Sequence, residues 1–136
     1  MQEITASEEV PLGADAVWAV IGDFGGISKW SKLVVDEKLE ETPEGRFRLL
    51  TLRDGKSFRE RLVEEGPHHY TYTLPRPGTK TYLSTVSVKP VSDSSCRIEL
   101  IVRFEPADGA SVDELADQMA DFCRGNLKAM KRAIGL

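Results

Sequence analysis

The sequence predicts an α+β fold, in which an antiparallel sheet of six to seven strands packs against one long C-terminal helix. Two observations support this prediction. Short β-rich segments separated by turn residues fill the middle of the chain, and helical periodicity runs through its C-terminal end. The chain has 136 residues, 40% of them hydrophobic, which suits one hydrophobic core. We therefore expect a single domain over residues 1–136.

The N-terminal part of the chain predicts one strand followed by two short helices. Residues 2–10 mix polar and β-branched types, as a strand does. Apolar residues then recur at helical spacing over residues 14–21. Three glycines within residues 22–26 end this helix. A second short helical turn is expected over residues 27–30.

The middle of the chain predicts a succession of antiparallel strands. Gly, Pro, Asp or Ser clusters mark the turns between them, as at Asp54-Gly55. Connections this short join antiparallel neighbours, because a parallel crossover needs about a dozen residues or more. The strands are expected over residues 33–40, 45–52, 56–65, 69–75, 80–90 and 95–105.

The last segment predicts a long amphipathic helix. Ser111 and Glu114 have the spacing of a capping box, with the serine as N-cap. Acidic residues fill the early turns, and Lys128 and Lys131 lie in the last ones, which matches the helix dipole. A helix of about 24 residues would be ~36 Å long. Its apolar positions recur at steps of three and four: Val112, Leu115, Met119, Phe122, Cys123, Leu127, Met130 and Ile134.

Composition excludes several classes of partner. With 18 basic and 22 acidic residues the formal net charge is −4, which argues against nucleic acid, because phosphate binding needs a basic surface. No apolar stretch approaches the ~20 residues that span a bilayer, and no secretory signal is visible. Two cysteines are too few for a disulfide framework. We expect a cytoplasmic protein without membrane insertion.

No cofactor or metal site is expected. His68 and His69 are the two histidines, and as strand neighbours they point to opposite faces and cannot chelate one ion together. No motif brings a histidine to Cys96 or Cys123, so a cysteine nucleophile is not indicated.

Several local patterns, in order along nearly the whole chain, resemble the helix-grip superfamily, which includes START domains, the birch-pollen allergen family and bacterial polyketide cyclase/dehydrase-like proteins. This resemblance implies a curved sheet wrapped around the long helix, with a cavity between them that admits small apolar ligands. The patterns are Ala16 to Phe24 followed by Trp30, Gly45-Arg46-Phe47-Arg48, Arg59-Glu60-Arg61-Leu62, Tyr70-Thr71-Tyr72 and Phe104-Glu105-Pro106.

Within that superfamily the chain also resembles the plant abscisic-acid receptors. The resemblance places Glu60, Tyr82, Ser84 and Asn126 at positions that line the hormone pocket there. The gate loop is reduced to residues 52–56, and the latch position reads Pro75-Arg76-Pro77-Gly78-Thr79-Lys80. The pocket lysine of those receptors falls near Ser31, one residue from Lys32. The resemblance therefore implies the pocket, but neither the hormone nor the gating mechanism.

The turn at Arg53-Asp54-Gly55 decides which side chains face the cavity. A three-residue hairpin with Gly55 in the left-handed region sets Arg48 opposite Glu60 on the apolar face that carries Leu50. Burying either charge alone would cost several kcal/mol, so we would expect the two to pair or to meet a polar ligand. A two-residue hairpin sets Glu60 opposite Leu49 instead and turns Arg48 outward.

We favour the three-residue turn because of the family resemblance. This register places the apolar side chains of Phe47 and Leu49 on the outward face of the sheet. An oligomer contact, such as a homodimer interface, could cover them there.

The candidate ligand-binding residues combine apolar walls with a few polar groups. Tyrosines offer an apolar body and one hydroxyl, and methionines adapt to varied ligand shapes. Trp30 is expected near the cavity mouth, and Tyr70 fits a cavity wall and a core equally well. The candidates are Trp30, Arg48, Leu50, Glu60, Tyr72, Tyr82, Ser84, Met119, Phe122 and Asn126.

Three functions fit these observations. The leading hypothesis is the binding of a hydrophobic or amphipathic small molecule, such as a lipid, polyketide or isoprenoid-like compound. The second is a polyketide cyclase/dehydratase-type enzyme that uses the same cavity, with Glu60 as the candidate catalytic residue. The third is a ligand-free protein-interaction module with a filled core and an apolar patch near Phe47 and Leu49.

Overall fold

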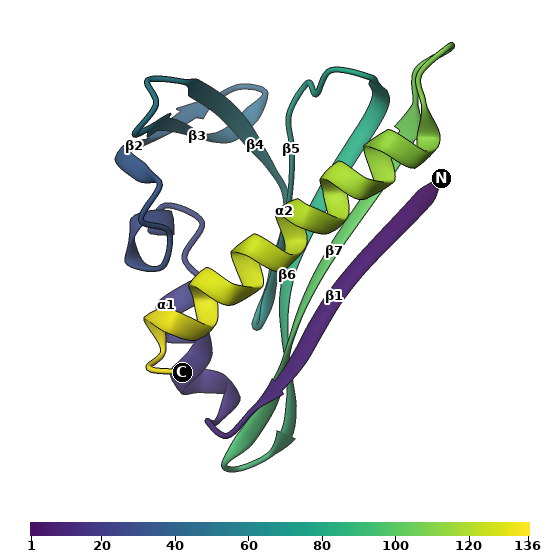
Figure 1. Ribbon diagram of the computed structural model, residues 1–136. Helices are drawn as coiled ribbons and strands as arrows, with labels where there is room; N and C mark the ends of the chain where they lie inside the picture. Colours follow the sequence, from purple (N-terminus) through teal and green to yellow (C-terminus); the bar gives the residue numbers. More distant parts are fainter.

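The computed structural model describes residues 1–136 and has the α+β architecture that the sequence predicts (Figure 1). Seven antiparallel strands form one sheet in the order β1-β7-β6-β5-β4-β3-β2. In chain order the elements are β1 (Gln2–Val10), α1 (Ala14–Ile21), the 3₁₀ turn η1 (Ile27–Lys29), β2 (Val34–Thr42), β3 (Gly45–Leu52), β4 (Ser57–Gly66), β5 (His69–Thr73), β6 (Thr79–Ser92), β7 (Ser95–Pro106) and α2 (Val112–Ala133).

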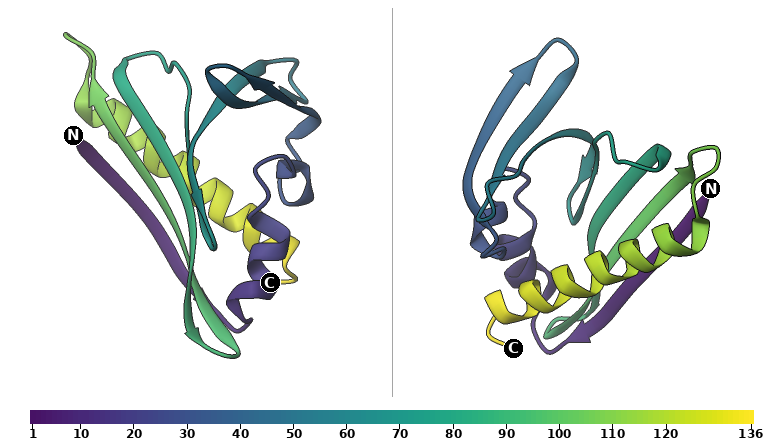
Figure 2. Two further views of the ribbon diagram at one scale, coloured as in Figure 1. Left: turned by 180° about the vertical axis from the view of Figure 1, so that it is seen from behind. Right: turned by 45° about the horizontal axis from the view of Figure 1, so that its top comes forward.

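Helix α2 crosses one face of the sheet and covers only part of it. In Figures 1 and 2 the helix runs beside β1 and β7, while β2, β3 and β4 lie on the other side of the molecule. The helix packs against β1 and β7, and no comparable packing joins it to β3, β4 or β5. This one-sided packing leaves the other part of the sheet face free to form a cavity wall.

The packed part of the molecule holds most of the hydrophobic core. One row of α2 is buried, and β7 presents alternate apolar side chains on the same side, as the strand period of two requires. The helix row consists of Leu115, Met119, Cys123, Leu127 and Met130, and the strand row of Cys96, Ile98, Leu100, Val102 and Phe104.

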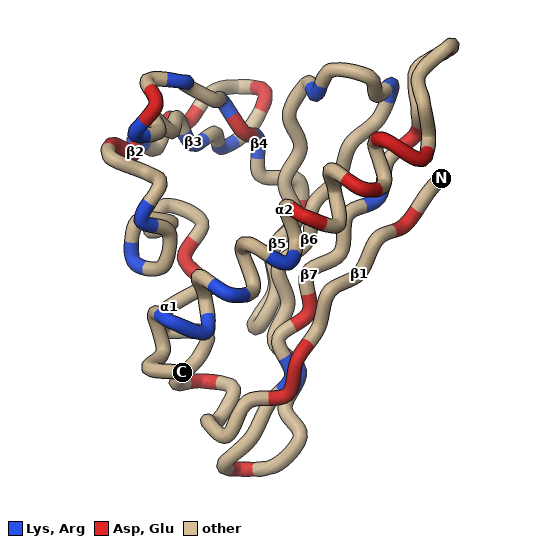
Figure 3. Tube along the Cα trace, in the orientation of Figure 1, with Lys and Arg blue, Asp and Glu red and all other residues tan.

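The start of α2 is capped as the sequence predicts. The Ser111 hydroxyl accepts a hydrogen bond from the Glu114 backbone N–H at 3.2 Å. Figure 3 shows acidic positions near the N-terminal end of the helix and basic ones toward its C-terminal end. The helix has 22 residues, close to the predicted length. Neither helix reaches the combination of length and apolar character that crossing a membrane requires.

The β3–β4 hairpin has the three-residue turn. Gly55 adopts φ 88°, in the left-handed region, and the Leu52 N–H donates to the Lys56 carbonyl at 2.8 Å. Arg48 therefore pairs with Glu60 across the strands, which confirms the favoured register.

The outward-facing Phe47 is covered within the chain itself. The Arg59 guanidinium lies 3.6 Å from the centre of the Phe47 ring and donates a hydrogen bond to Glu40 at 2.9 Å. Only 8% of Phe47 is exposed, and Leu49 is half-buried. Neither side chain therefore needs a second copy of the chain to cover it.

Candidate ligand-binding cavity

A cavity of about 480 Å³ lies between α2 and the part of the sheet that the helix does not cover. Volumes of roughly 300 to 1,000 Å³ are usual for small-molecule sites. The cavity is lined by 24 residues, 15 of them hydrophobic, which come mainly from β3 to β6, the segment Ile27–Val34, the loop after β5 and α2. Its wall is thus mostly apolar, with a small number of polar groups.

Most of the α2 contribution comes from one helix row, and Cys123 from the neighbouring row also lines the cavity. Gln118, Phe122 and Asn126 follow each other at i, i+4 spacing and line the cavity. Met119 belongs to the neighbouring row, is fully buried and does not line the cavity, so its predicted place in the cavity wall is wrong. Of this neighbouring row only Cys123 lines the cavity, whereas Met119, one helical turn earlier, packs among the side chains of the hydrophobic core.

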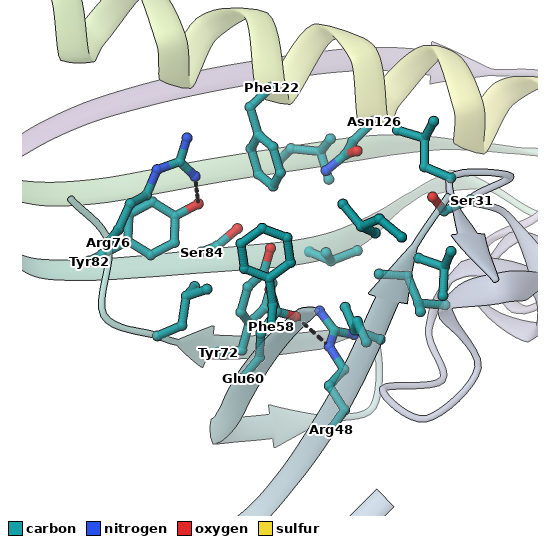
Figure 4. Close-up of a pocket in the computed structure, with 18 of the residues that line it drawn as sticks. Ser31, Arg48, Phe58, Glu60, Tyr72, Arg76, Tyr82, Ser84, Phe122 and Asn126 are labelled. Atoms are coloured by element: carbon teal, nitrogen blue, oxygen red, sulfur yellow. Dashed lines mark hydrogen bonds and ion pairs between the residues drawn. The ribbon is translucent and has the colours of Figure 1, made fainter. Parts of the chain in front are cut away.

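An ion pair is set into this apolar wall. The Arg48 Nε donates a hydrogen bond to Glu60 Oε1 at 2.7 Å, and the exposed fractions of the two side chains are 1% and 10% (Figure 4). Both residues line the cavity, from neighbouring strands β3 and β4. A buried pair of this kind is stable only if its partners stay together, because either charge alone would be poorly solvated.

Aromatic rings and two further acceptors hold the Arg48 guanidinium in place. Its Nη1 donates to the Phe24 carbonyl at 3.0 Å and to the Tyr70 hydroxyl at 3.4 Å. The guanidinium carbon lies 4.4 Å from the centre of the Phe24 ring and 4.6 Å from that of Tyr72. Burial lowers the pKa of Arg48, but Tyr70, Glu60 and Tyr72 outweigh it, so the pKa is raised and the group stays charged.

Several polar atoms in this wall have no partner in the chain. Neither Nη2 of Arg48 nor Oε2 of Glu60 makes a hydrogen bond to another group of the protein. Trp30, which is 5% exposed and lines the cavity, has a buried indole N–H without an acceptor. An unmade hydrogen bond at a buried group costs about 1 to 3 kcal/mol. These atoms are therefore available to the polar groups of a ligand.

Tyr72 and Tyr82 belong to the same cavity wall. Burial raises the pKa of Tyr82 to about 12, while Arg76 and Ser84 lower it in part. Burial also raises the pKa of Tyr72 well above its ordinary value, and the negative charge of Glu60 adds to this rise. Both phenols are therefore protonated at neutral pH and can donate hydrogen bonds.

The cavity brings together all but one of the predicted ligand-binding residues. Trp30, Arg48, Leu50, Glu60, Tyr72, Tyr82, Ser84, Phe122 and Asn126 line it. Tyr70 lines it too, although it is 1% exposed and also belongs to the hydrophobic core. Trp30 forms part of the buried wall, and its expected place near the mouth stays a prediction. Contact of these residues with a ligand stays a prediction.

The sequence pattern missed other lining residues. Arg76 lies in the loop between β5 and β6, and the sequence analysis noted it only at the latch position, between two prolines, and not as a candidate ligand-binding residue. Ser31 and Phe58 were not singled out as site residues either, although Phe58 shares the strand face of Glu60. Gln118 lies four residues before Phe122 at the edge of the apolar helix stripe, and a polar residue at such an edge could have been noticed.

The two cysteines and the two histidines do not take part in this polar cluster. Cys96 and Cys123 are free thiols, and burial raises the pKa of Cys123, which lines the cavity, to about 11. His68 bonds to Asp15 at 2.9 Å and His69 to Glu64 at 2.8 Å, both outside the cavity. Cys123 is thus protonated at neutral pH and a poor nucleophile.

Comparison with known proteins assigns the chain to a family. The family model described as polyketide cyclase/dehydrase and lipid transport matches residues 1–135. No curated protein matches the sequence. An uncharacterised protein from Bacillus thuringiensis is 29% identical, with a TM-score of 0.85 over 98% of each chain.

Two more distant structures share the fold. A START superfamily protein from Mycobacterium smegmatis is 14% identical, with a TM-score of 0.76 over 97% of this chain and 96% of that chain. The di-domain ARO/CYC protein BexL, from the BE-7585A biosynthetic pathway, is 16% identical, with a TM-score of 0.84; all of this chain matches 47% of that chain. Given the family match over residues 1–135, the chain belongs to the polyketide cyclase/dehydrase and lipid-transport family and has a START-like helix-grip fold.

Proposed function

We propose that this protein binds a small amphipathic molecule in the cavity beneath α2. The observation that carries this proposal is the buried Arg48–Glu60 pair in the wall of a mostly apolar cavity of about 480 Å³. A stable hydrophobic core does not require this ion pair. Replacing a buried ion pair by apolar residues of similar volume often leaves a protein at least as stable. Arg48 Nη2 and Glu60 Oε2, which have no partner in the chain, can bond a carbonyl and a hydroxyl of the ligand.

The cavity size limits the ligand class. Its volume equals about sixteen water volumes, at ~30 Å³ each. A fused ring system or one short acyl or isoprenoid chain fits this space, whereas a two-chain lipid does not fit as a whole. Apolar walls supply affinity at roughly 25 cal/mol per Å² buried, less the cost of ordering the ligand. A hollow of this size also argues against the filled core expected of a ligand-free interaction module.

Two neutral probes, 2-naphthol and decan-1-ol, test the proposal. We expect isothermal titration calorimetry to detect one-to-one binding of at least one probe by the wild-type protein. Ser84→Phe, on the cavity face of β6, should weaken it about tenfold or more because the new ring occupies the cavity. Ser87→Phe adds the same ring on the same strand, outside the cavity lining, and should leave affinity within about twofold.

Val86→Phe provides a second cavity-filling variant in case Ser84→Phe does not fold, which circular dichroism would report. Equal affinities of wild type and both cavity-filling variants would place binding elsewhere and overturn the proposal. Failure of the wild type to bind either probe, at concentrations up to their solubility, would overturn it as well.

A polyketide cyclase-type enzyme is the second candidate, and the placement of Tyr72 beside Glu60 favours it. In an intramolecular aldol condensation, Glu60 would take a proton from a carbon between two carbonyls. The resulting carbanion would attack another carbonyl of the same chain, and protonated Tyr72 would give its proton to that oxygen. This carbon–carbon bond closes the ring, and loss of the new hydroxyl as water then forms a carbon–carbon double bond: a second carbon-bound proton returns to Tyr72, and the proton held by Glu60 leaves with the hydroxyl, so no oxidant or reductant is needed.

Glu60→Gln separates the two candidates, with short poly-β-ketone chains as test substrates. Loss of ring formation with probe affinity retained would support the enzyme. Loss of affinity alone would support the binding protein. The amide keeps the volume of the side chain but removes the charge, so the variant reports on proton transfer more than on packing.

We also propose that the protein acts in the cytoplasm without nucleic acid as a partner. Two free, buried thiols support a reducing compartment. The excess of acidic over basic residues, 22 against 18, argues against a phosphate-binding surface.

A further inference from the structure

Arg76 is a second arginine in the cavity wall, at a distance from the first along the chain and in the fold. It lies in the loop between β5 and β6, flanked by Pro75 and Pro77. Its side chain is half-buried, and its Nη1 donates to the Tyr82 hydroxyl at 3.2 Å. Figure 4 shows Arg76 and Tyr82 together at one end of the cavity, apart from the Arg48–Glu60 pair.

The charges of the cavity wall do not balance. Arg48, Glu60 and Arg76 are its ionised side chains, and Glu60 is paired with Arg48. Arg76 forms no ion pair with any carboxylate, whereas nearby Lys80 pairs with Asp108 at 3.1 Å. The β5–β6 loop, residues 74–78, contains Arg76 and no acidic residue, and Figure 3 shows basic and no acidic positions where β5 and β6 connect. The cavity thus has one uncompensated positive charge, although the whole chain has a net charge of −4.

The position of Arg76 is suited to an anion. The guanidinium carbon lies 5.0 Å from the centre of the Tyr82 ring and 5.3 Å from that of Phe122, so two rings confine it. Most of its N–H donors make no bond within the chain, and a guanidinium binds a carboxylate through two parallel hydrogen bonds. Because the Tyr82 oxygen accepts from Arg76, its own O–H is free to donate to the same anion.

From these observations we infer that the ligand is an amphipathic acid whose carboxylate binds Arg76 and Tyr82, while a hydroxyl or carbonyl at its other end meets the Arg48–Glu60 pair. This inference rests on the proposed function and adds the chemical class and the orientation of the ligand. The two ends of the cavity differ in charge. One end carries the arginine–glutamate pair, which is neutral as a whole, and the other carries an unpaired cation. A ligand with a polar neutral end and an acidic end satisfies both.

Matched acids and amides test the inference. The probes are 2-naphthaleneacetate with 2-naphthaleneacetamide, and decanoate with decanamide, titrated by calorimetry at pH 7.5. In each pair the two molecules have nearly the same shape and differ in charge. We expect at least one acid to bind about tenfold or more tightly than its amide, since hydrogen bonds to charged groups are the stronger ones.

Arg76→Met should remove this preference, so that the acid and its amide bind with affinities within about threefold of each other. Lys80→Met removes the same charge from the neighbouring surface, outside the cavity lining, and should keep the preference. An acid preference that survives in Arg76→Met, or is lost equally in Lys80→Met, would overturn the assignment of the anion to Arg76.

The outcomes also separate this inference from the proposed function. Equal binding of acid and amide by the wild type would leave the cavity as a binding site and overturn the acidic ligand. Absence of binding for all four molecules, and for the neutral probes 2-naphthol and decan-1-ol, would overturn both. Arg76→Lys, which keeps the charge but loses the two parallel donors, should retain part of the preference.

Discussion

The two parts of the sheet differ in what lies against them. Next to β1 and β7, α2 buries an unbroken row of apolar side chains, and several of these residues are fully buried. Over β3, β4 and β5 the helix leaves a cavity, and the wall there contains a buried ion pair and all three tyrosines of the chain. The first part thus holds most of the hydrophobic core, and the second part is the one in which we propose that a ligand binds.

The largest difference should appear when the same aromatic side chain is removed from each part. Phe104, on β7, is fully buried, and Phe104→Ala should lower the free energy of unfolding by about 3 to 5 kcal/mol. Phe122 is half-buried and borders the cavity, so Phe122→Ala should cost less than about 2 kcal/mol. Urea denaturation of both variants measures this, and equal losses would show that the cavity part is packed as tightly as the core.

Ion pairs on the two faces of the β3–β4 hairpin provide the next comparison. Glu60→Leu leaves Arg48 buried without its partner and should cost about 3 kcal/mol, most of which Arg48→Met should restore in the double variant. Glu40→Leu breaks the exposed pair with Arg59 and should cost less than about 1 kcal/mol. A double-mutant cycle with no coupling between residues 48 and 60 would contradict the buried pair.

Alkaline pH should destabilise the cavity part of the molecule first. Tyr82 has a pKa of about 12 in the folded protein, above the value of about 10 for an unfolded chain, and burial raises the pKa of Tyr70 and Tyr72 too. The stabilisation that this shift represents is complete below pH 10 and is lost as pH rises through 12. For Tyr82 it amounts to roughly 2 to 3 kcal/mol.

Absorbance at the phenolate wavelength, with urea denaturation at pH 9 to 11, measures this effect. Phenols that titrate near pH 10 in the folded protein would refute burial of the tyrosines. Tyr82→Phe should lose less stability than wild type over the same pH range, because it has one fewer phenol to ionise.

The smallest effects concern two glycines with free space around them. Gly55 has φ 88°, so Gly55→Ala should destabilise the hairpin by about 1 kcal/mol. Gly125 lies within α2, and Gly125→Ala should stabilise the protein by about 0.5 to 1 kcal/mol. The two substitutions should therefore shift the thermal midpoint in opposite directions, and a higher midpoint for Gly55→Ala would contradict the left-handed turn.

The sequence alone predicted the elements because their signals are local. The capping box at Ser111 and the turn residues at Asp54-Gly55 act within a few positions, so they could be recognised without knowledge of the fold. The register of the β3–β4 hairpin was harder to predict from the sequence, because both faces of β3 carry apolar residues. The outward Phe47 made the wrong register look plausible, and only the tertiary contact with Arg59 explains how that ring is covered.

Which helix row faces the cavity could not be predicted from periodicity. Met119 and Phe122 belong to one apolar stripe in the sequence, yet the first packs into the core and the second lines the cavity. The packing of α2 against β1 and β7 decides between them, and this packing is a property of the whole fold. Arg76 was missed for a similar reason, since a loop side chain has no periodicity that predicts its direction.

The central claim is that an open cavity beneath α2 presents Glu60 and Arg48 to a ligand. A crystal structure of the protein with 6-hydroxy-2-naphthoate, whose rings carry a hydroxyl and a carboxylate, tests it most directly. We expect the rings inside the cavity, with the hydroxyl within hydrogen-bonding distance of Glu60. Side chains packed through that space, with no density for the naphthoate and the Glu60 carboxylate turned to bulk water, would contradict the account.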